Sequence, residues 1–260
     1  MVSSMINANR KKILALVEGS KTEVTLMRKL FSLYHIDVKY EIVSYGTTIH
    51  TLYQEMFRDG IEGFEGLDLL QVLKSREKDI DKKKIFEEKY TDILLIFDPD
   101  PHDPQFNASH IQLMQEYFYE SSDTGKLYIN YPMVEAFYHM NCIPDVNYAD
   151  KKVYLAELKE KIYKTRVQQE TIGRDYRKFI KDEADCSIVI LQNLSKALYI
   201  VTGQAIQWEN IMEIISSIGL TSVLEQQLLL INTYGFLYVL CTCVFFILDY
   251  DPKLLLHDGL

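Results

Sequence analysis

The sequence KILALVEGSKTE, from Lys12 to Glu23, decides how the rest of the chain is interpreted. Its apolar run, Ile13 to Val17, has the length of a short buried strand. Glu18 and a glycine follow directly, and apolar residues then recur at helical spacing. The stretch therefore predicts a strand, a tight turn that carries a carboxylate, and a helix that Ser20 or Thr22 could cap.

The end of this stretch, Gly19-Ser20-Lys21-Thr22, resembles the tail of a phosphate-binding loop. A Walker loop needs a glycine, four residues and then Gly-Lys-Ser/Thr, so that backbone N–H groups surround the phosphates. Here Ser20 separates Gly19 from Lys21, and no earlier glycine supports the loop. The motif is therefore not a Walker loop, and Lys21 is either a phosphate contact or an exposed lysine on the first helical turn.

Strand-like runs alternate with helical patterns as far as residue 140, which predicts an α/β fold with a parallel sheet flanked by helices. Further strands are expected at Val38–Tyr45, Ile93–Phe97 and Leu127–Ile129. Helices are expected at Thr22–Tyr34, Thr48–Phe57, Lys74–Lys89 and from Met133 to His139.

After residue 145 the pattern becomes mainly helical. We therefore divide the chain into an α/β domain, residues 1–145, and a helical domain, residues 146–260. The expected helices of the second domain are Lys151–Lys164, Asp175–Lys181, Cys186–Tyr199, Trp208–Ile218 and Thr221–Tyr234.

A second acidic stretch, TDILLIFDPDPHD, runs from Thr91 to Asp103. Its apolar run ends at Asp98, and Asp100 follows with one proline between them. Two neighbouring carboxylates repel each other unless a cation offsets the repulsion, so the pattern indicates a divalent-metal site that His102 and Asp103 could extend. An acidic turn in water is the alternative, because proline and aspartate are common turn formers.

These motifs together resemble the TOPRIM domain of primases, topoisomerases and nucleases. The string Glu18-Gly-Ser-Lys-Thr-Glu23 is similar to the Glu-Gly-x-x-Thr-Glu of the branch related to overcoming-lysogenization-defect (OLD) and RloB-like proteins. The segment INYPMVEAFYH, residues 129–139, resembles the Asn-Pro-x-x-Glu region of that branch, with Tyr131 inserted between the asparagine and the proline. The resemblance covers residues 12 to 140 and extends to the effectors of ATPase–TOPRIM anti-phage systems such as PARIS.

The resemblance implies a Mg²⁺- or Mn²⁺-dependent nuclease that acts on DNA or RNA, tRNA included, as a toxic effector of anti-phage defence. Glu18, Asp98 and Asp100 would bind the metal and carry catalysis, and Glu23 and Glu135 would be additional metal ligands. Related defence nucleases carry or work with an ABC-type ATPase. Since this chain has no phosphate loop, we expect a separate ATPase partner.

The formal net charge of −9 means that nucleic-acid binding must be local. Between Lys151 and Lys181, ten basic residues stand against four acidic ones, which gives a local charge of 10 − 4 = +6. This segment is either a phosphate-binding stripe or the solvated face of a helix. The expected nucleic-acid contacts are Lys21, Lys161, Lys164, Arg166, Arg174 and Arg177.

The four cysteines lack the spacing of a metal site, which predicts free, mostly buried thiols and a cytoplasmic protein. The uncharged stretch Leu228–Leu248 is as long as a membrane span, but Asn232 to Gly235 divide it. We expect a buried helix followed by a core strand or helix rather than a membrane anchor. This segment is compatible with a monomer core and with a homodimer interface.

Three other functions share parts of the pattern. A haloacid dehalogenase-type phosphatase also has Asp-x-Asp after a strand, but here His102 occupies the fifth position of that motif. A topoisomerase or primase would require DNA-gripping parts that the sequence does not show. A TOPRIM-like binding or regulatory module with little catalysis is the main alternative to a nuclease.

Overall fold

The structure is a computed structural model that describes residues 11–36, 38–57, 68–175, 178–204 and 219–255. Within these ranges, five strands form one sheet in the order β2-β1-β3-β5-β4, and only the short edge strand β4 is antiparallel to its neighbour. The strands are β1 (Lys12–Val17), β2 (Lys39–Ser44), β3 (Asp92–Phe97), β4 (Tyr119–Glu120) and β5 (Gly125–Ile129). The predicted α/β class, a parallel sheet flanked by helices, is confirmed.

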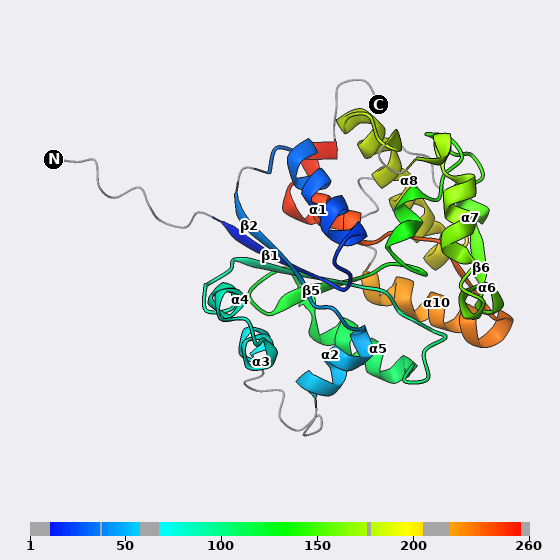
Figure 1. Ribbon diagram of the computed structural model, residues 1–260. Coiled ribbons are helices and arrows are strands. Elements are labelled where there is room, and N and C mark those ends of the chain that lie inside the picture. The colour runs from blue at the N-terminus through cyan, green and yellow to red at the C-terminus, as the bar shows by residue number, and fades with distance from the viewer. Residues whose placement is uncertain (1–10, 37, 58–67, 176–177, 205–218, 256–260) are drawn as a thin grey trace.

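Helices cover both faces of this sheet (Figure 1). One face carries α1 (Thr22–Leu33) and α11 (Phe246–Tyr250), whose Phe31 and Phe246 rings meet edge to face at 5.2 Å. The other face carries α2 (Ile49–Met56), α3 (Leu69–Arg76) and α5 (Ala108–Tyr117), with α4 (Ile80–Ile85) beside α3.

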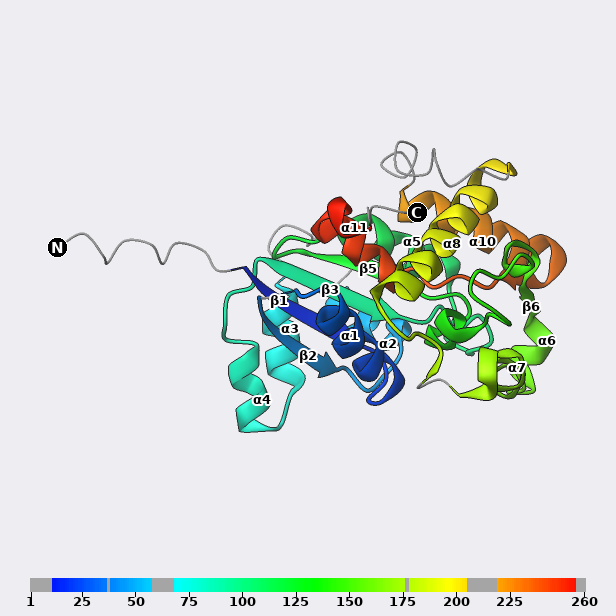
Figure 2. The same cartoon turned by 90° about the horizontal axis from the view of Figure 1, so that it is seen from above.

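The remaining elements gather beyond the carboxyl ends of the strands, as both views show (Figures 1 and 2). They are the 3₁₀ turn η2 (Val134–Tyr138), α6 (Leu155–Lys159), α7 (Tyr163–Glu170), α8 (Glu183–Thr202), α10 (Leu220–Tyr234) and a second, two-stranded sheet of β6 (Lys152–Tyr154) and β7 (Phe236–Tyr238).

The parallel register places the ends of three strands at one edge. Val17 pairs with Ile96, and Phe97 pairs with Ile129, so the residues that follow β1, β3 and β5 emerge together. The strands β1 and β3 are almost wholly buried, which explains why their sequences are continuous apolar runs. Glu18, Asp98 and Asn130 therefore begin the loops at this edge.

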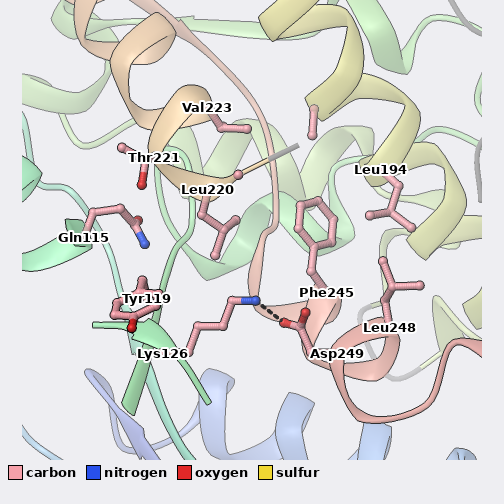
Figure 3. Close-up of a pocket in the computed structure, with 12 residues that line it drawn as sticks. Gln115, Tyr119, Lys126, Leu194, Leu220, Thr221, Val223, Phe245, Leu248 and Asp249 are labelled. Carbon is pink, nitrogen blue, oxygen red and sulfur yellow. Dashed lines mark hydrogen bonds and ion pairs between the residues drawn. The ribbon is translucent and has the colours of Figure 1, made fainter. Parts of the chain in front are cut away.

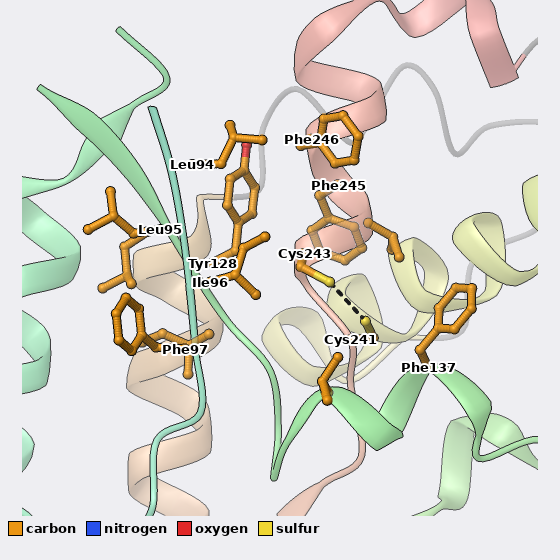
Figure 4. Close-up of a cluster of buried hydrophobic side chains, with 14 of the residues drawn as sticks. Leu94, Leu95, Ile96, Phe97, Tyr128, Phe137, Cys241, Cys243, Phe245 and Phe246 are labelled. Carbon is orange, nitrogen blue, oxygen red and sulfur yellow. Dashed lines mark hydrogen bonds between the residues drawn. The ribbon is translucent and has the colours of Figure 1, made fainter. Parts of the chain in front are cut away.

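The C-terminal segment returns to the sheet and completes its core, where Cys243, Phe245 and Phe246 lie beside Tyr128 (Figure 4). Tyr131 forms a backbone bridge with Leu240, and the buried Asn130 side chain accepts hydrogen bonds from the backbone N–H groups of Thr242 (3.1 Å) and Cys243 (3.2 Å). Cys241 and Cys243 are buried, and their sulfur atoms lie 3.5 Å apart as free thiols. The hydrophobic core is thus continuous across residue 145, the boundary that the sequence suggested.

Two expected helices are wrong in part. The stretch 74–89 contains the end of α3 and a separate α4, because the Asp79 side chain caps a new helix by accepting from the backbone N–H groups of Asp81 and Lys82. The stretch 151–164 begins with β6 and contains α6, and α7 starts only at Tyr163. The expected helix 208–218 and part of 175–181 lie outside the described residues.

The apolar stretch 228–248 contains four different elements. Helix α10 ends at Tyr234, where Gly235 takes a left-handed conformation (φ 68°), and β7, a 3₁₀ turn (Cys243–Phe245) and the start of α11 follow. Among the described residues one helix, α8, is long and apolar enough to cross a membrane, and 61% of its apolar window is buried inside the fold. A core helix has this property.

Candidate functional site

The carboxylates that the sequence singled out lie at the carboxyl edge of the main sheet. The backbone N–H of Glu18 continues the β1–β3 ladder by donating to Ile96, and the Glu18 carboxylate accepts from the backbone N–H of Asp98 at 3.1 Å. Asp100 has a left-handed backbone (φ 42°), which is unusual for a residue other than glycine and which aspartate tolerates better than most. This strained turn keeps Asp100 next to Glu18, whose charge it affects.

Glu23 joins this edge from the first turn of α1. The backbone N–H groups of Glu23 itself and of Gly19 lower the pKa of its carboxyl group, in opposition to burial, which raises it. The expected caps are not used, because Lys21 occupies the N-cap position and makes no side-chain cap hydrogen bond. The Glu23 carboxylate thus lies at the positive end of the helix, where a negative charge is stabilised.

Gly19 makes room for this arrangement. A Cβ atom at position 19 would lie 2.5 to 2.9 Å from the carboxylate atoms of Glu23. Such distances are too short for real contacts, so any larger residue must displace the Glu23 side chain. The glycine of the Glu-Gly-x-x-Thr-Glu string is therefore explained by the glutamate four residues later.

We expect Gly19→Ala to separate stability from function. The displaced group is the end of a flexible side chain, so the free energy of unfolding should change by less than about 1 kcal/mol. The affinity of this edge for a divalent cation should fall roughly 10- to 100-fold, as for the loss of an orienting group. Urea unfolding and the increase in melting temperature with Mg²⁺ or Mn²⁺ would test this, with exposed Ser20→Ala as the neighbouring control. An unchanged increase in Gly19→Ala would contradict the role given to Glu23.

Glu135 reaches the same edge from η2, although Tyr131 interrupts the Asn-Pro motif. It is 4% exposed; its Oε1 atom forms an ion pair with Nζ of Lys164 at 3.1 Å, and its Oε2 atom is buried without a hydrogen-bond partner. Lys164 also interacts electrostatically with Asp98 and Glu23. A buried carboxylate oxygen without a partner is uncommon in folded proteins and indicates a site for a ligand atom.

A buried network holds α7, and thus Lys164, in place. The fully buried His139 lies between the Tyr163 hydroxyl (3.1 Å from Nδ1) and the Glu170 carboxylate (2.7 Å from Nε2). Burial lowers the pKa of His139 to about 4, so the neutral ring donates from Nε2 to Glu170 and accepts at Nδ1 from Tyr163. Glu170 also accepts from Lys151 and Arg166.

The ionisation of these carboxylates is strongly perturbed. Burial, together with the charges of Asp100 and Glu23, raises the pKa of Glu18 to about 8, while the hydrogen bond from the backbone of Asp98 opposes this shift. Burial and the nearby Glu18 charge raise the pKa of Asp98. Burial also raises the pKa of Asp100 and of Glu23. Negative charge is therefore costly at this edge unless a cation compensates it.

The donor chemistry fits a hard divalent cation, because it consists of clustered carboxylates with one oxygen lacking a partner. Within the part of the chain that the structure describes, however, no group of three His, Cys, Asp or Glu side chains is arranged so that it could hold a metal ion. Glu18 instead accepts a hydrogen bond from the backbone N–H of Asp98. The cluster has the composition of a metal site without a formed ligand shell.

The expected basic contacts are scattered. Lys21, Lys161 and Arg174 are exposed, and Arg166 donates to Glu157, Glu170 and the Lys152 carbonyl. Arg177 lies outside the described residues. Of the predicted bases that are described, Lys164 is the one with an ion pair to the carboxylate cluster.

Two histidines beside Asp100 extend the site. The interactions of Asp100 with His102 and His50 lower the pKa of Asp100, in opposition to burial, which raises it. His50, at the start of α2, is 3% exposed and has no hydrogen-bond partner at either ring nitrogen, and Nδ1 of His102 is also buried without one. The sequence indicated His102 through its place after Asp-Pro-Asp, whereas His50 had no local signal because 50 residues separate it from Asp100.

A cavity of 270 Å³ lies elsewhere, at the amino end of β5 (Figure 3). Its charged groups, Lys126 and Asp249, pair with each other at 2.7 Å, and its other lining residues are mostly apolar. Because these two charges neutralise each other, the cavity has less charge available to bind a ligand than the carboxylate edge has.

Comparison with known proteins adds no relative: no protein-family model, no curated protein and no solved structure matches the chain.

Proposed function

We propose that this protein is a Mg²⁺- or Mn²⁺-dependent endonuclease of the TOPRIM type, with Glu18, Asp98 and Asp100 as its metal-binding and catalytic residues. The observation that carries the proposal is the convergence of five carboxylates, those three together with Glu23 and Glu135, at the carboxyl edge of a parallel sheet. Ligand sites of open α/β sheets lie at this edge.

Each residue has a role that its position supports. The acid cluster would hold the cation, which when bound activates water and stabilises charge on the scissile phosphate. Glu23, fixed by Gly19, and Glu135, fixed by Lys164, would orient this set. The half-exposed Lys164 would also attract the phosphate backbone to the carboxylates.

A cleavage assay tests this proposal. The purified protein should cut single-stranded RNA, tRNA or DNA in about 5 mM Mg²⁺ or Mn²⁺. EDTA should abolish cleavage. The double variant Glu18→Ala/Asp98→Ala should be inactive, whereas Glu116→Ala, on the exposed surface of α5, should retain wild-type activity. Cleavage by the double variant would rule out the metal-site assignment.

A binding or regulatory module with little catalysis is the second candidate. It is favoured by the absence, among the described residues, of a three-residue group arranged to hold a metal ion. A module of this kind would show neither cleavage nor an increase in melting temperature with millimolar metal, whereas a nuclease with this cluster gains stability from the bound cation.

The biological setting that we propose rests on the resemblance to anti-phage effectors. It comprises a toxic effector in the cytoplasm, restrained or triggered by a separate ABC-type ATPase. Four free cysteines, three of them buried, are in keeping with a reducing compartment. Co-purification with the product of an adjacent ATPase gene would test the partnership.

A further inference from the structure

The small sheet of β6 and β7 has an aromatic outer face. In each strand the middle residue, Val153 or Leu237, is fully buried, so the residues on either side point outward. Outward positions on a half-exposed sheet are normally polar. Here they are Lys152, Tyr154, Phe236 and Tyr238.

These rings continue into a row that includes the end of α10. Tyr154 and Phe236 are cross-strand partners with ring centroids 5.8 Å apart, and the ring of Tyr234 lies 5.9 Å from Phe236 at an interplanar angle of 25°. Tyr154 is 46% exposed and Tyr234 is 64% exposed. The row therefore offers accessible aromatic surface that the fold does not need for its core.

A positive charge accompanies the rings. The Lys152 ammonium lies 4.7 Å from the Phe236 centroid and 5.6 Å from that of Tyr154, and no ion pair links it to an acidic side chain within the described residues. A ligand with both planar rings and negative charges would find a partner for each of them on this face.

Helix α7 connects this row to the carboxylate edge. Lys164 contacts Glu135, and two residues later the Arg166 guanidinium donates to the Lys152 carbonyl at 3.1 Å. Figures 1 and 2 both place β6 and α6 next to α7. The same helix therefore places the ammonium group of Lys164 at the candidate active site and, through Arg166, supports the strand β6 that belongs to the aromatic row.

We propose that the β6–β7 face, with Tyr154, Phe236, Tyr234 and Lys152, binds single-stranded nucleic acid by stacking its bases and leads the strand along α7 to the carboxylate edge. The bases of a single strand can stack on the aromatic rings, and its phosphates can approach the Lys152 ammonium, which has no acidic partner among the described residues. Aromatic surfaces of this kind bind all bases, because every base has a planar face. The proposal rests on the nuclease function and names its substrate class as single-stranded.

The test measures binding separately from cleavage. Fluorescence anisotropy with labelled single-stranded RNA and DNA oligonucleotides is carried out in EDTA on the full chain. We expect Tyr154→Ala/Tyr234→Ala to bind at least about tenfold more weakly than wild type. Lys152→Gln should reduce the salt dependence of binding. Tyr119→Ala removes an equally exposed tyrosine (61%) on β4, far from this row in sequence, and should bind as wild type does.

Several results would overturn the inference. One is wild-type affinity in the double variant, and another is an equal loss of affinity in the Tyr119→Ala control. A third is tighter binding of a duplex than of either single strand. The last is a wild-type dimer that the double variant converts to a monomer. Aromatic-dependent binding without metal-dependent cleavage would refute the nuclease and leave this surface established, whereas cleavage with unchanged binding by the double variant would refute this surface alone.

Discussion

Asp98→Asn is expected to lower the cleavage rate at least about a thousandfold and, in EDTA at pH 8, to make the protein more stable. The two effects have one cause. Asp98 is held among Glu18, Asp100, Glu23 and Glu135, where burial and their repulsion raise its pKa and make its charged form costly. A neutral amide of the same shape removes that cost together with a proposed metal ligand.

The local structure should tolerate this change, because the backbone N–H of Asp98, and not its side chain, donates to Glu18. Asp92→Asn is the matched control, since Asp92 begins the same strand at the opposite edge of the sheet. Cleavage by single-turnover kinetics and the midpoint of urea unfolding would measure both effects. A destabilised but active Asp98→Asn protein would contradict this account of the cluster.

The sheet was predictable because its strands are buried on both faces. Continuous apolar runs at 13–17 and 93–97 can form little else than core strands, and parallel pairing then brings Glu18 and Asp98 together. The two motifs lie 80 residues apart, yet each one ends a strand, so their meeting follows from the topology. This part of the site required no side-chain detail.

Elements that depend on distant partners were not predictable. The three-residue β6 is a strand only because β7, more than 80 residues later, pairs with it. The separate α4 depends on a single cap at Asp79, which a charge-rich helical pattern conceals. Local sequence records neither the pairing of a short strand nor the competition between a cap and a helix interior.

The missing parts of the site have the same origin. Lys164 was expected in a general basic stripe, and its ion pair with Glu135 depends on how the His139–Glu170 network fixes α7. Arg166, from the same stripe, turns to Glu157 and Glu170 instead. Charge counting located the basic segment but could not distinguish the side chain beside the carboxylates from the one inside a structural network.

In the absence of metal, we expect Glu18 to contribute a loss of stability as the pH rises from about 6.5 to about 8. The pKa of Glu18 is about 8 in the folded state, against 4.5 for an unperturbed glutamate. Between these values the folded state binds more protons than the unfolded state, so each increase in pH favours unfolding. The contribution of Glu18 to the slope should approach about 1.4 kcal/mol per pH unit.

The comparison of variants isolates the carboxylate edge, because Lys196, whose pKa burial lowers well below 10.5, makes stability rise with pH in part of the same range. His139, whose pKa falls from 6.5 to about 4 on folding, and Glu170, whose pKa falls to about 2, make stability rise with pH, but they do so below about pH 6.5. Glu18→Gln should flatten the slope between pH 6.5 and 8 in urea titrations, although Asp98, Asp100 and Glu23 will retain part of it because burial raises their pKa values too. Glu116→Gln, on the exposed face of α5, should keep the wild-type slope.

Millimolar Mg²⁺ or Mn²⁺ should stabilise the wild type more at pH 8 than at pH 6.5, since the cation then meets ionised carboxylates without first displacing their protons. The same slope in Glu18→Gln and in the wild type would show that Glu18 ionises freely, and the cluster would then have no excess of negative charge for a cation to offset.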